Sequence, residues 1–143
     1  MLREGKAWHF TLREVARRAG VSHAAPYKHF SDKAALLAEL ALQGYRQLQE
    51  DLITAILPVG GSPHSELIAL AKAYLDFGRA NPSLFELMFS SEIDKSGDAS
   101  LKEASCAPVL IIADILTRGQ RARLFKRAPV EVRLPRYGRL FTD

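Results

Sequence analysis

The chain has 143 residues, 48% of them hydrophobic, which is enough for one sizeable core or a small domain with a partial one and argues against wholesale disorder. Its formal net charge of +4 is uneven: residues 1–33 carry seven Lys and Arg against three Asp and Glu, residues 34–119 six against eleven, and residues 120–143 seven against two. The overall basic balance is therefore a weak argument for a nucleic-acid partner, because the tail contributes as much to it as the N-terminal segment does.

The first predicted element is a short amphipathic helix that begins after Thr11. Thr11 can cap its N-terminus, and Glu14 follows three residues later, as a capping box requires. Apolar residues at helical spacing form the buried face: Leu12, Val15, Ala16 and Ala19. Three arginines fall on the exposed face: Arg13, Arg17 and Arg18. Gly20 follows the last periodic residue and supplies the positive φ with which chains commonly leave a helix.

A second short helix is predicted over roughly residues 23–30. Ser22 is placed to cap it, and Pro26 lies within about one turn of its start, where a missing N–H costs little. Val21, in the turn, is expected to fill the core between the two helices. Two short helices joined by a four-residue turn have the sequence shape of a helix-turn-helix, whose second helix reads the major groove of DNA.

The candidate DNA contacts lie on and around this second helix. Base edges would be met by His23, Ala24 and Ala25, of which only His23 can hydrogen-bond a base, so we expect modest sequence specificity. Side chains suited to phosphate contacts surround them: Ser22, Tyr27, Lys28, His29 and Lys33. Arg13, on the exposed face of the first helix, is a further DNA-binding candidate.

Apolar periodicity predicts four further helices, over about residues 34–57, 62–80, 81–90 and 101–118, with a loop over 91–100. Ser31 is expected to cap the first of them, and Pro108 should break or kink the last. The long helix would begin on the DNA-binding unit and end in the second domain. A tilt at one end would then move the other, which makes this helix a candidate allosteric lever.

The pattern T-x-R-x-V-A-x-x-A-G-V-S-x-x-x-x-Y-x-H-F-x-x-K-x-x-L-L, which starts at Thr11, resembles the DNA-binding domain of the TetR family of bacterial transcriptional regulators. The resemblance implies DNA-backbone contacts from Thr11, Tyr27, His29 and Lys33. It implies a recognition-helix surface formed by Ser22, His23, Ala24, Ala25 and Lys28. It also implies a larger helical domain that dimerises and usually holds an apolar effector pocket, and residues 81–89 resemble the effector domain of one branch of the family.

The predicted fold class is all-α, with a helix-turn-helix DNA-binding domain followed by a partial helical-bundle regulatory domain. We expect the DNA-binding domain over residues 1–40, with the family's first helix largely missing ahead of Gly5. An incomplete effector and dimerisation domain would cover residues 41–119. Residues 120–143 would form a basic, disordered tail in place of the family's two dimer-forming helices, which leaves dimerisation in doubt.

Several aromatic and apolar side chains are candidates for an effector pocket: Tyr74, Phe77, Phe85, Met88 and Phe89. Residues at this spacing also form ordinary hydrophobic core, and that alternative stays open. Cys106 is similarly either a small buried side chain or a redox-sensitive thiol.

Catalytic and metal sites are not indicated. No Ser/His/Asp, Cys/His, Glu-x-x-His or phosphate-cradling Gly-rich set is visible, and His23 and His29 are too far apart for a metal pair on one helix face. The single cysteine cannot form an internal disulfide. The longest apolar run covers only residues 109–113, and no signal-peptide core is present. We therefore expect a cytoplasmic protein that is not an enzyme, with no cofactor, no metal and no membrane contact.

The leading hypothesis is a ligand-responsive repressor of the TetR type, which binds a palindromic operator on double-stranded DNA as a homodimer and is released by a small apolar effector. The alternative is a degenerate or truncated regulator fragment without autonomous DNA binding, which acts, if at all, by pairing with another protein. A helical-bundle enzyme, the third possibility, has little support in the sequence.

Overall fold

The computed structural model describes residues 11–22, 24–28, 30–91, 93–125, 133–134 and 138–139. The helices are α1 (Leu12–Ala19), η1 (Pro26–Lys28, a 3-10 helix), α2 (Lys33–Ile56), η2 (Leu57–Val59, also 3-10), α3 (Pro63–Ala80), α4 (Pro82–Met88) and α5 (Ala99–Arg121). Strands β1 (Arg133–Leu134) and β2 (Gly138–Arg139) pair antiparallel and have two residues each. Helices dominate the fold, so the predicted all-α class is confirmed.

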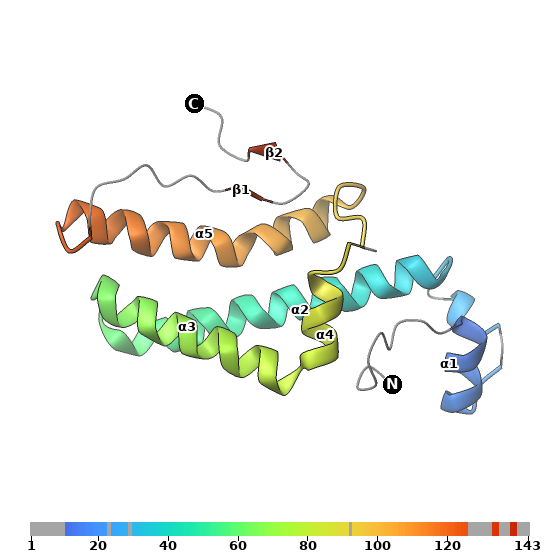
Figure 1. The fold of residues 1–143 in the computed structure, drawn as a ribbon. Helices are drawn as coiled ribbons and strands as arrows, with labels where there is room; N and C mark the ends of the chain where they lie inside the picture. The colour runs from blue at the N-terminus through green and yellow to red at the C-terminus, as the bar shows by residue number, and fades with distance from the viewer. Residues whose placement is uncertain are drawn as a thin grey trace.

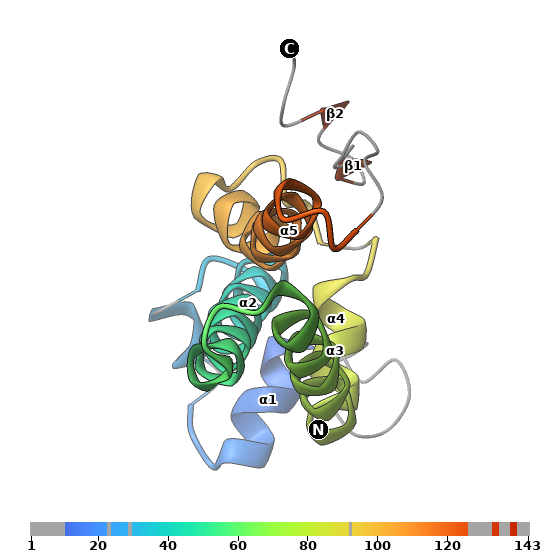
Figure 2. The same ribbon diagram turned by 90° about the vertical axis from the view of Figure 1, so that its left-hand side faces the viewer.

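The long helix α2 forms the centre of the molecule. Helices α3 and α5 run along it, and the view down the bundle shows the three helices as a triangle, with α4 packed beside α2 and α3 (Figures 1 and 2). Helix α1 lies at the end of the molecule where α2 begins (Figure 1). The prediction of one long helix that joins the N-terminal unit to the bundle is confirmed, with its start at Lys33.

The core lies between α2, α3, α4 and α5. Its largest fully buried side chains are Tyr45, Leu48, Leu52, Leu87, Met88, Leu101 and Ile115. Four elements contribute to one continuous apolar cluster, so the bundle depends on residues that are far apart in sequence. Cys106 is also buried, at 4% exposure, as expected for a small apolar side chain.

The N-cap predicted for α2 was wrong, and the break that Pro108 could cause in α5 does not occur. Asp32, and not Ser31, caps α2, because its carboxylate accepts a hydrogen bond from the Ala35 N–H at 2.8 Å. Pro108 lies inside α5 and is buried, yet the helix continues past it to Arg121. Proline removes only one hydrogen bond from the helix, and packing of α5 along both α2 and α3 keeps the remaining turns in place.

Candidate nucleic-acid interface

Helix α1 is held by the caps that its sequence predicts. The Thr11 hydroxyl accepts from the Glu14 N–H at 3.2 Å, and the Glu14 carboxylate accepts from the Thr11 N–H at 3.3 Å. At the other end Gly20 adopts a φ of 69°, which a side chain would disfavour. The first helix of the motif therefore begins and ends where the sequence indicates.

One face of α1 is packed and the opposite face is basic. Leu12 and Ala16 are buried, at 3% and 0% exposure, whereas the three arginines of the helix, Arg13, Arg17 and Arg18, are exposed. This division fits an element that packs inward through its apolar side and offers cations to a polyanion.

The second helix differs from its prediction. An α-helix was expected over about residues 23–30, but the described residues there form only the 3-10 helix Pro26–Lys28. Pro26 has no N–H to donate to the Ser22 carbonyl, so Ala25 makes an i→i+3 bond to that carbonyl at 2.9 Å instead. Phe30 then bonds to the Pro26 carbonyl at 2.9 Å, which is the spacing of a single α-helical turn.

The predicted contact residues that the structure describes lie near the surface at this end of the molecule. Thr11, Arg13, Ser22, Ala24 and Lys28 are exposed, while Ala25 and Lys33 are half-buried. The Ser22 hydroxyl oxygen accepts from the Ala24 N–H at 3.3 Å, so this side chain caps the turn locally. His23, His29 and the side chain of Tyr27 lie outside the described part of the chain, and their predicted roles remain predictions.

Val21 does not fill the core as expected. It is 48% exposed, whereas Leu12 and Ala16 of α1 are buried. Val21 therefore adds an apolar side chain to the surface of the turn.

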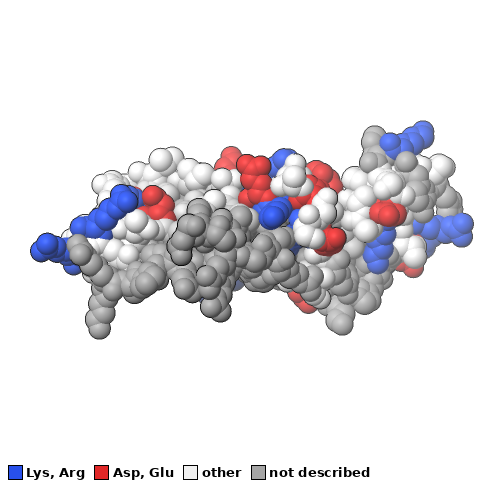
Figure 3. All heavy atoms as spheres, turned by 90° about the horizontal axis from the view of Figure 1, so that it is seen from above, with Lys and Arg blue, Asp and Glu red and all other residues white. Residues whose placement is uncertain are grey.

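Charge is segregated along the molecule. Seen from above, Lys and Arg gather at the two ends of the surface, and most Asp and Glu lie over the middle (Figure 3). The acidic middle would repel a phosphate backbone, whereas the basic α1 end suits contact with DNA. Charge alone does not separate this end from the other basic end, but the α1 end carries the helix-turn-helix pattern.

The predicted effector residues form one aromatic cluster. The Phe85 ring lies 5.7 Å from the Tyr74 ring, 6.5 Å from the Phe77 ring and 4.8 Å from the Phe89 ring, centroid to centroid. Met88 is fully buried beside them. Burial also raises the pKa of the Tyr74 hydroxyl. The residues are thus brought together, in close mutual packing, and their ligand-binding role remains a prediction.

Two hollows lie elsewhere in the described part of the chain. One, of about 450 Å³, lies between α2 and α5 and is lined by Gln49, Ile56, Glu103, Ala107, Leu110, Ile111, Asp114 and Ile115. The other, of about 470 Å³, lies where the first turns of α2 meet the segment that precedes α5, and is lined by Asp32, Lys33, Ala34, Leu37, Ala38, Ile93 and Asp94. The second hollow adjoins Lys33, one of the predicted DNA contacts.

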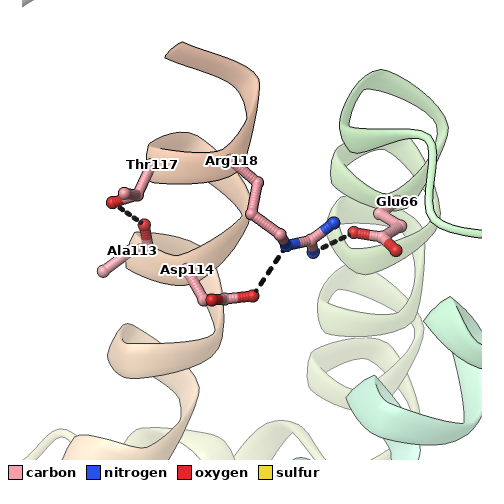
Figure 4. Close-up of polar contacts among 5 residues, drawn as sticks. All are labelled: Glu66, Ala113, Asp114, Thr117 and Arg118. Carbon is pink, nitrogen blue, oxygen red and sulfur yellow. Dashed lines mark hydrogen bonds and ion pairs between the residues drawn. The ribbon is translucent and has the colours of Figure 1, made fainter. Parts of the chain in front are cut away.

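An ion pair that joins α3 to α5 was not foreseen from the sequence. Arg118 donates to the buried carboxylate of Glu66 and, at 2.9 Å, to Asp114 one turn earlier on α5 (Figure 4). These bonds, first to Glu66 and then to Asp114, raise the pKa of the Arg118 guanidinium. Glu66 and Arg118 are 52 residues apart, so no local pattern could have paired them.

Removing the Glu66 carboxylate should cost the protein about 1 kcal/mol of stability, because the half-exposed Arg118 loses its buried partner and is only partly compensated by water. We expect Glu66→Ala to lower the midpoint of urea unfolding followed by circular dichroism. Asp114→Ala is the matched control: that carboxylate is 68% exposed, and its loss should change stability by less than about 0.5 kcal/mol. Equal effects of the two substitutions would contradict the argument.

The fold and the site together define a class: a small helix-turn-helix unit with an arginine face, attached through one long helix to a helical bundle. Residues 5–40 match the bacterial regulatory proteins of the tetR family, and residues 67–136 match the tetracyclin repressor-like C-terminal domain. The chain belongs to the TetR family of bacterial transcriptional regulators. This family consists of regulators rather than enzymes.

Individual relatives agree with this assignment. The chain is 26% identical over 96 residues to the uncharacterized HTH-type transcriptional regulator YobS of Bacillus subtilis (strain 168), and the match covers 67% of this chain and 49% of YobS. A protein of unknown function from Rhodococcus sp. RHA1 superimposes with a TM-score of 0.76 at 34% identity, covering 89% of this chain and 66% of that one. The match to YobS, the curated relative, thus spans about half of that protein's length.

A second solved structure shows the same fold. PfmR, a TetR family transcriptional regulator from Thermus thermophilus, superimposes with a TM-score of 0.74 at 21% identity, over 87% of this chain and 69% of PfmR. Within the described residues, no helix is long and apolar enough to cross a membrane, and no three His, Cys, Asp or Glu side chains group as metal ligands.

Proposed function

We propose that this chain is a DNA-binding transcriptional regulator that represses transcription from an operator on double-stranded DNA and responds to a small ligand. The observation that carries the proposal is the capped, glycine-terminated helix α1 with its exposed arginines, at the end of the molecule where α2 begins (Figure 1). Residues 1–40 would bind DNA, residues 41–119 would receive the effector, and residues 120–143 would be a basic tail. The protein would act in the cytoplasm.

Contacts to phosphate would come from α1 and the turn, and base readout would centre on His23. Since α2 starts at Lys33 and continues into the bundle as far as Ile56, a ligand that changes the packing around α2 would also move the N-terminal unit. The aromatic cluster of Tyr74, Phe77, Phe85, Met88 and Phe89 adjoins α2 and is the candidate effector region. Binding to a palindromic operator would require a homodimer, which we include in the proposal.

The test is the salt dependence of binding to a mixed-sequence DNA duplex, followed by fluorescence anisotropy. The slope of log K against log salt is negative, and Arg13→Ala and Lys28→Ala should each make it less steep by about 1, because each removes one phosphate contact. Lys72→Ala, an exposed lysine on α3, is the control and should leave the slope unchanged. Identical slopes for all three variants and the parent chain would refute the proposed interface.

The homodimer is tested separately, by light scattering coupled to gel filtration. A compact dimer would support the regulator proposed above, whereas a monomer that binds no duplex even at low salt would favour a fragment that works through another protein.

A further inference from the structure

The hollow between α2 and α5 has the size and the lining of a small-molecule site. Its volume of about 450 Å³ lies within the range of about 300–1,000 Å³ that is usual for ligand pockets. Apolar side chains form most of its wall: Ile56 of α2 and Ala107, Leu110, Ile111 and Ile115 of α5. Leu110 is 41% exposed, so part of this apolar wall is open to solvent.

The polar lining of the hollow is acidic and unevenly paired. It consists of Gln49 on α2 and of Glu103 and Asp114 on α5. Since a helix rises about 1.5 Å per residue, the two carboxylates lie about 16 Å apart along α5, with most of the apolar wall between them. Asp114 accepts a hydrogen bond from Arg118 at 2.9 Å, which compensates its charge. In the part of the chain that the structure describes, no hydrogen bond or ion pair reaches the exposed Glu103 carboxylate.

We propose that this hollow binds a small monocation with an apolar body: an amine whose ammonium pairs with Glu103 and whose hydrocarbon part lies along Leu110 and Ile111. Leu110 is seven residues beyond Glu103, about 10 Å along the helix axis, which is the span of an arylalkyl amine. Burial of the hydrocarbon part supplies most of the binding energy, and the exposed ion pair selects the charge.

Other charge classes fit the hollow less well. An anion would meet Glu103 on a bundle that carries eleven Asp and Glu against six Lys and Arg over residues 34–119. A dication long enough to reach the other end would meet Arg118, which already pairs with Asp114. A metal ion prefers several oxygen ligands, whereas the lining of the hollow offers one uncompensated carboxylate. The lining therefore favours a single positive charge.

The inference rests on the proposed function in one respect: it gives the chemical class of the effector and a place for it within the predicted effector domain. The hollow is separate from the aromatic cluster, because none of its lining residues belongs to that cluster. Its wall includes Ile56, the last residue of α2, so a ligand between α2 and α5 acts on the helix that starts at Lys33.

Titration of the full chain with 4-phenylbutylamine, followed by amide chemical shifts in NMR and with no DNA present, tests the site. The shift changes should concentrate on α5 around residues 103–111 and on α2 around residues 49–56. The alcohol 4-phenylbutan-1-ol has the same hydrocarbon part without the charge and should bind about three- to fivefold more weakly. Shift changes that gather elsewhere, or equal affinity for the amine and the alcohol, would overturn the inference.

Glu103→Gln isolates the contribution of the carboxylate at a position whose exposure makes the change harmless to the fold. It should weaken binding of the amine about three- to fivefold and leave binding of the alcohol unchanged. Asp76→Asn, at an exposed carboxylate on α3, removes the same charge away from the hollow and should leave both affinities unchanged. An equal loss in the two variants would show that net charge attracts the amine, against the inference.

Ala107→Leu tests the hollow itself. Ala107 is half-buried in the wall, and leucine is also a good helix former, so the larger side chain takes up ligand volume without interrupting α5. Binding of both the amine and the alcohol should fall at least about fivefold, because less of the hydrocarbon part is buried. If this variant is unstable, Leu110→Ala serves instead and should weaken both ligands about threefold. Undiminished binding in the folded variant would contradict the site, and because these assays contain no DNA, their outcome is independent of the phosphate-contact test.

Discussion

Leu52→Ala should destabilise the protein by about 2–5 kcal/mol, the largest loss that we expect from any single change considered for this chain. Leu52 lies on α2, is 0% exposed and belongs to the cluster in which α2, α3, α4 and α5 meet. Truncation would remove its transfer free energy and leave a cavity in a core that has little room to relax. A domain of this size has a net stability of about 5–15 kcal/mol, so the variant would lose a large share of it.

The matched control is Leu57→Ala, five residues further along the chain. Leu57 follows directly after α2 and is 73% exposed, so Leu57→Ala removes the same atoms from a solvated position and should change stability by less than about 0.5 kcal/mol. Urea unfolding of both variants, monitored by circular dichroism at equal protein concentration, measures the difference. Similar midpoints for the two variants would show that α2 is not the centre of the core.

Local signals in the sequence were sufficient for both ends of α1 and poor for the effect of a proline inside a helix. The capping box of Thr11 and Glu14 and the glycine at position 20 act within one turn, so their effects can be read directly from spacing. Pro108 was expected to break or kink α5. The helix is not broken there, because the cost of one lost hydrogen bond is smaller than the packing that the rest of the helix gains. Tertiary contacts decided the outcome there, and a single sequence does not reveal them.

In the second helix of the motif, a local effect of proline was underestimated. Pro26 is compatible with the first turn of a helix, which led to the prediction of an α-helix over residues 23–30. In the structure the missing N–H changes the bonding of the Ser22 carbonyl and yields the short 3-10 segment Pro26–Lys28. The predicted DNA contacts stay in the same segment of the chain, but the directions of their side chains depend on this local backbone geometry.

Contacts between distant elements were beyond the reach of sequence patterns. Glu66 pairs with Arg118 across 52 residues, and Lys95 reaches Tyr45 across 50. Each side chain alone reads as an ordinary polar or aromatic residue on an amphipathic helix or in a loop. Both contacts became visible only when the fold placed α3 against α5, and the segment after α4 against α2.

Alanine substitutions at Gly44 on α2 and at Gly78 on α3 are the second prediction, because they should change the stability of the protein in opposite directions. A Cβ atom at Gly44 would lie 2.6 Å from the Met88 sulfur and 3.1 Å from a Leu84 methyl carbon, inside a fully packed region. At Gly78 a Cβ would lie 3.6 Å from the nearest atom of the Phe85 ring, which is ordinary contact. The same substitution therefore meets a clash in one helix and an unstrained contact in the other.

We expect Gly44→Ala to destabilise the protein by about 1–2 kcal/mol, because overpacking outweighs the gain in helix propensity. Gly78→Ala should stabilise it by about 0.5–1 kcal/mol through propensity alone. Thermal unfolding of the two variants should thus shift the midpoint in opposite directions. Since Met88 must move to admit the new methyl group, Gly44→Ala should also perturb the Tyr45 hydroxyl, which donates to the Met88 carbonyl. A stabilising Gly44→Ala would mean that α4 can shift away from α2 at little cost, and that the packing between these two helices is not tight at this point.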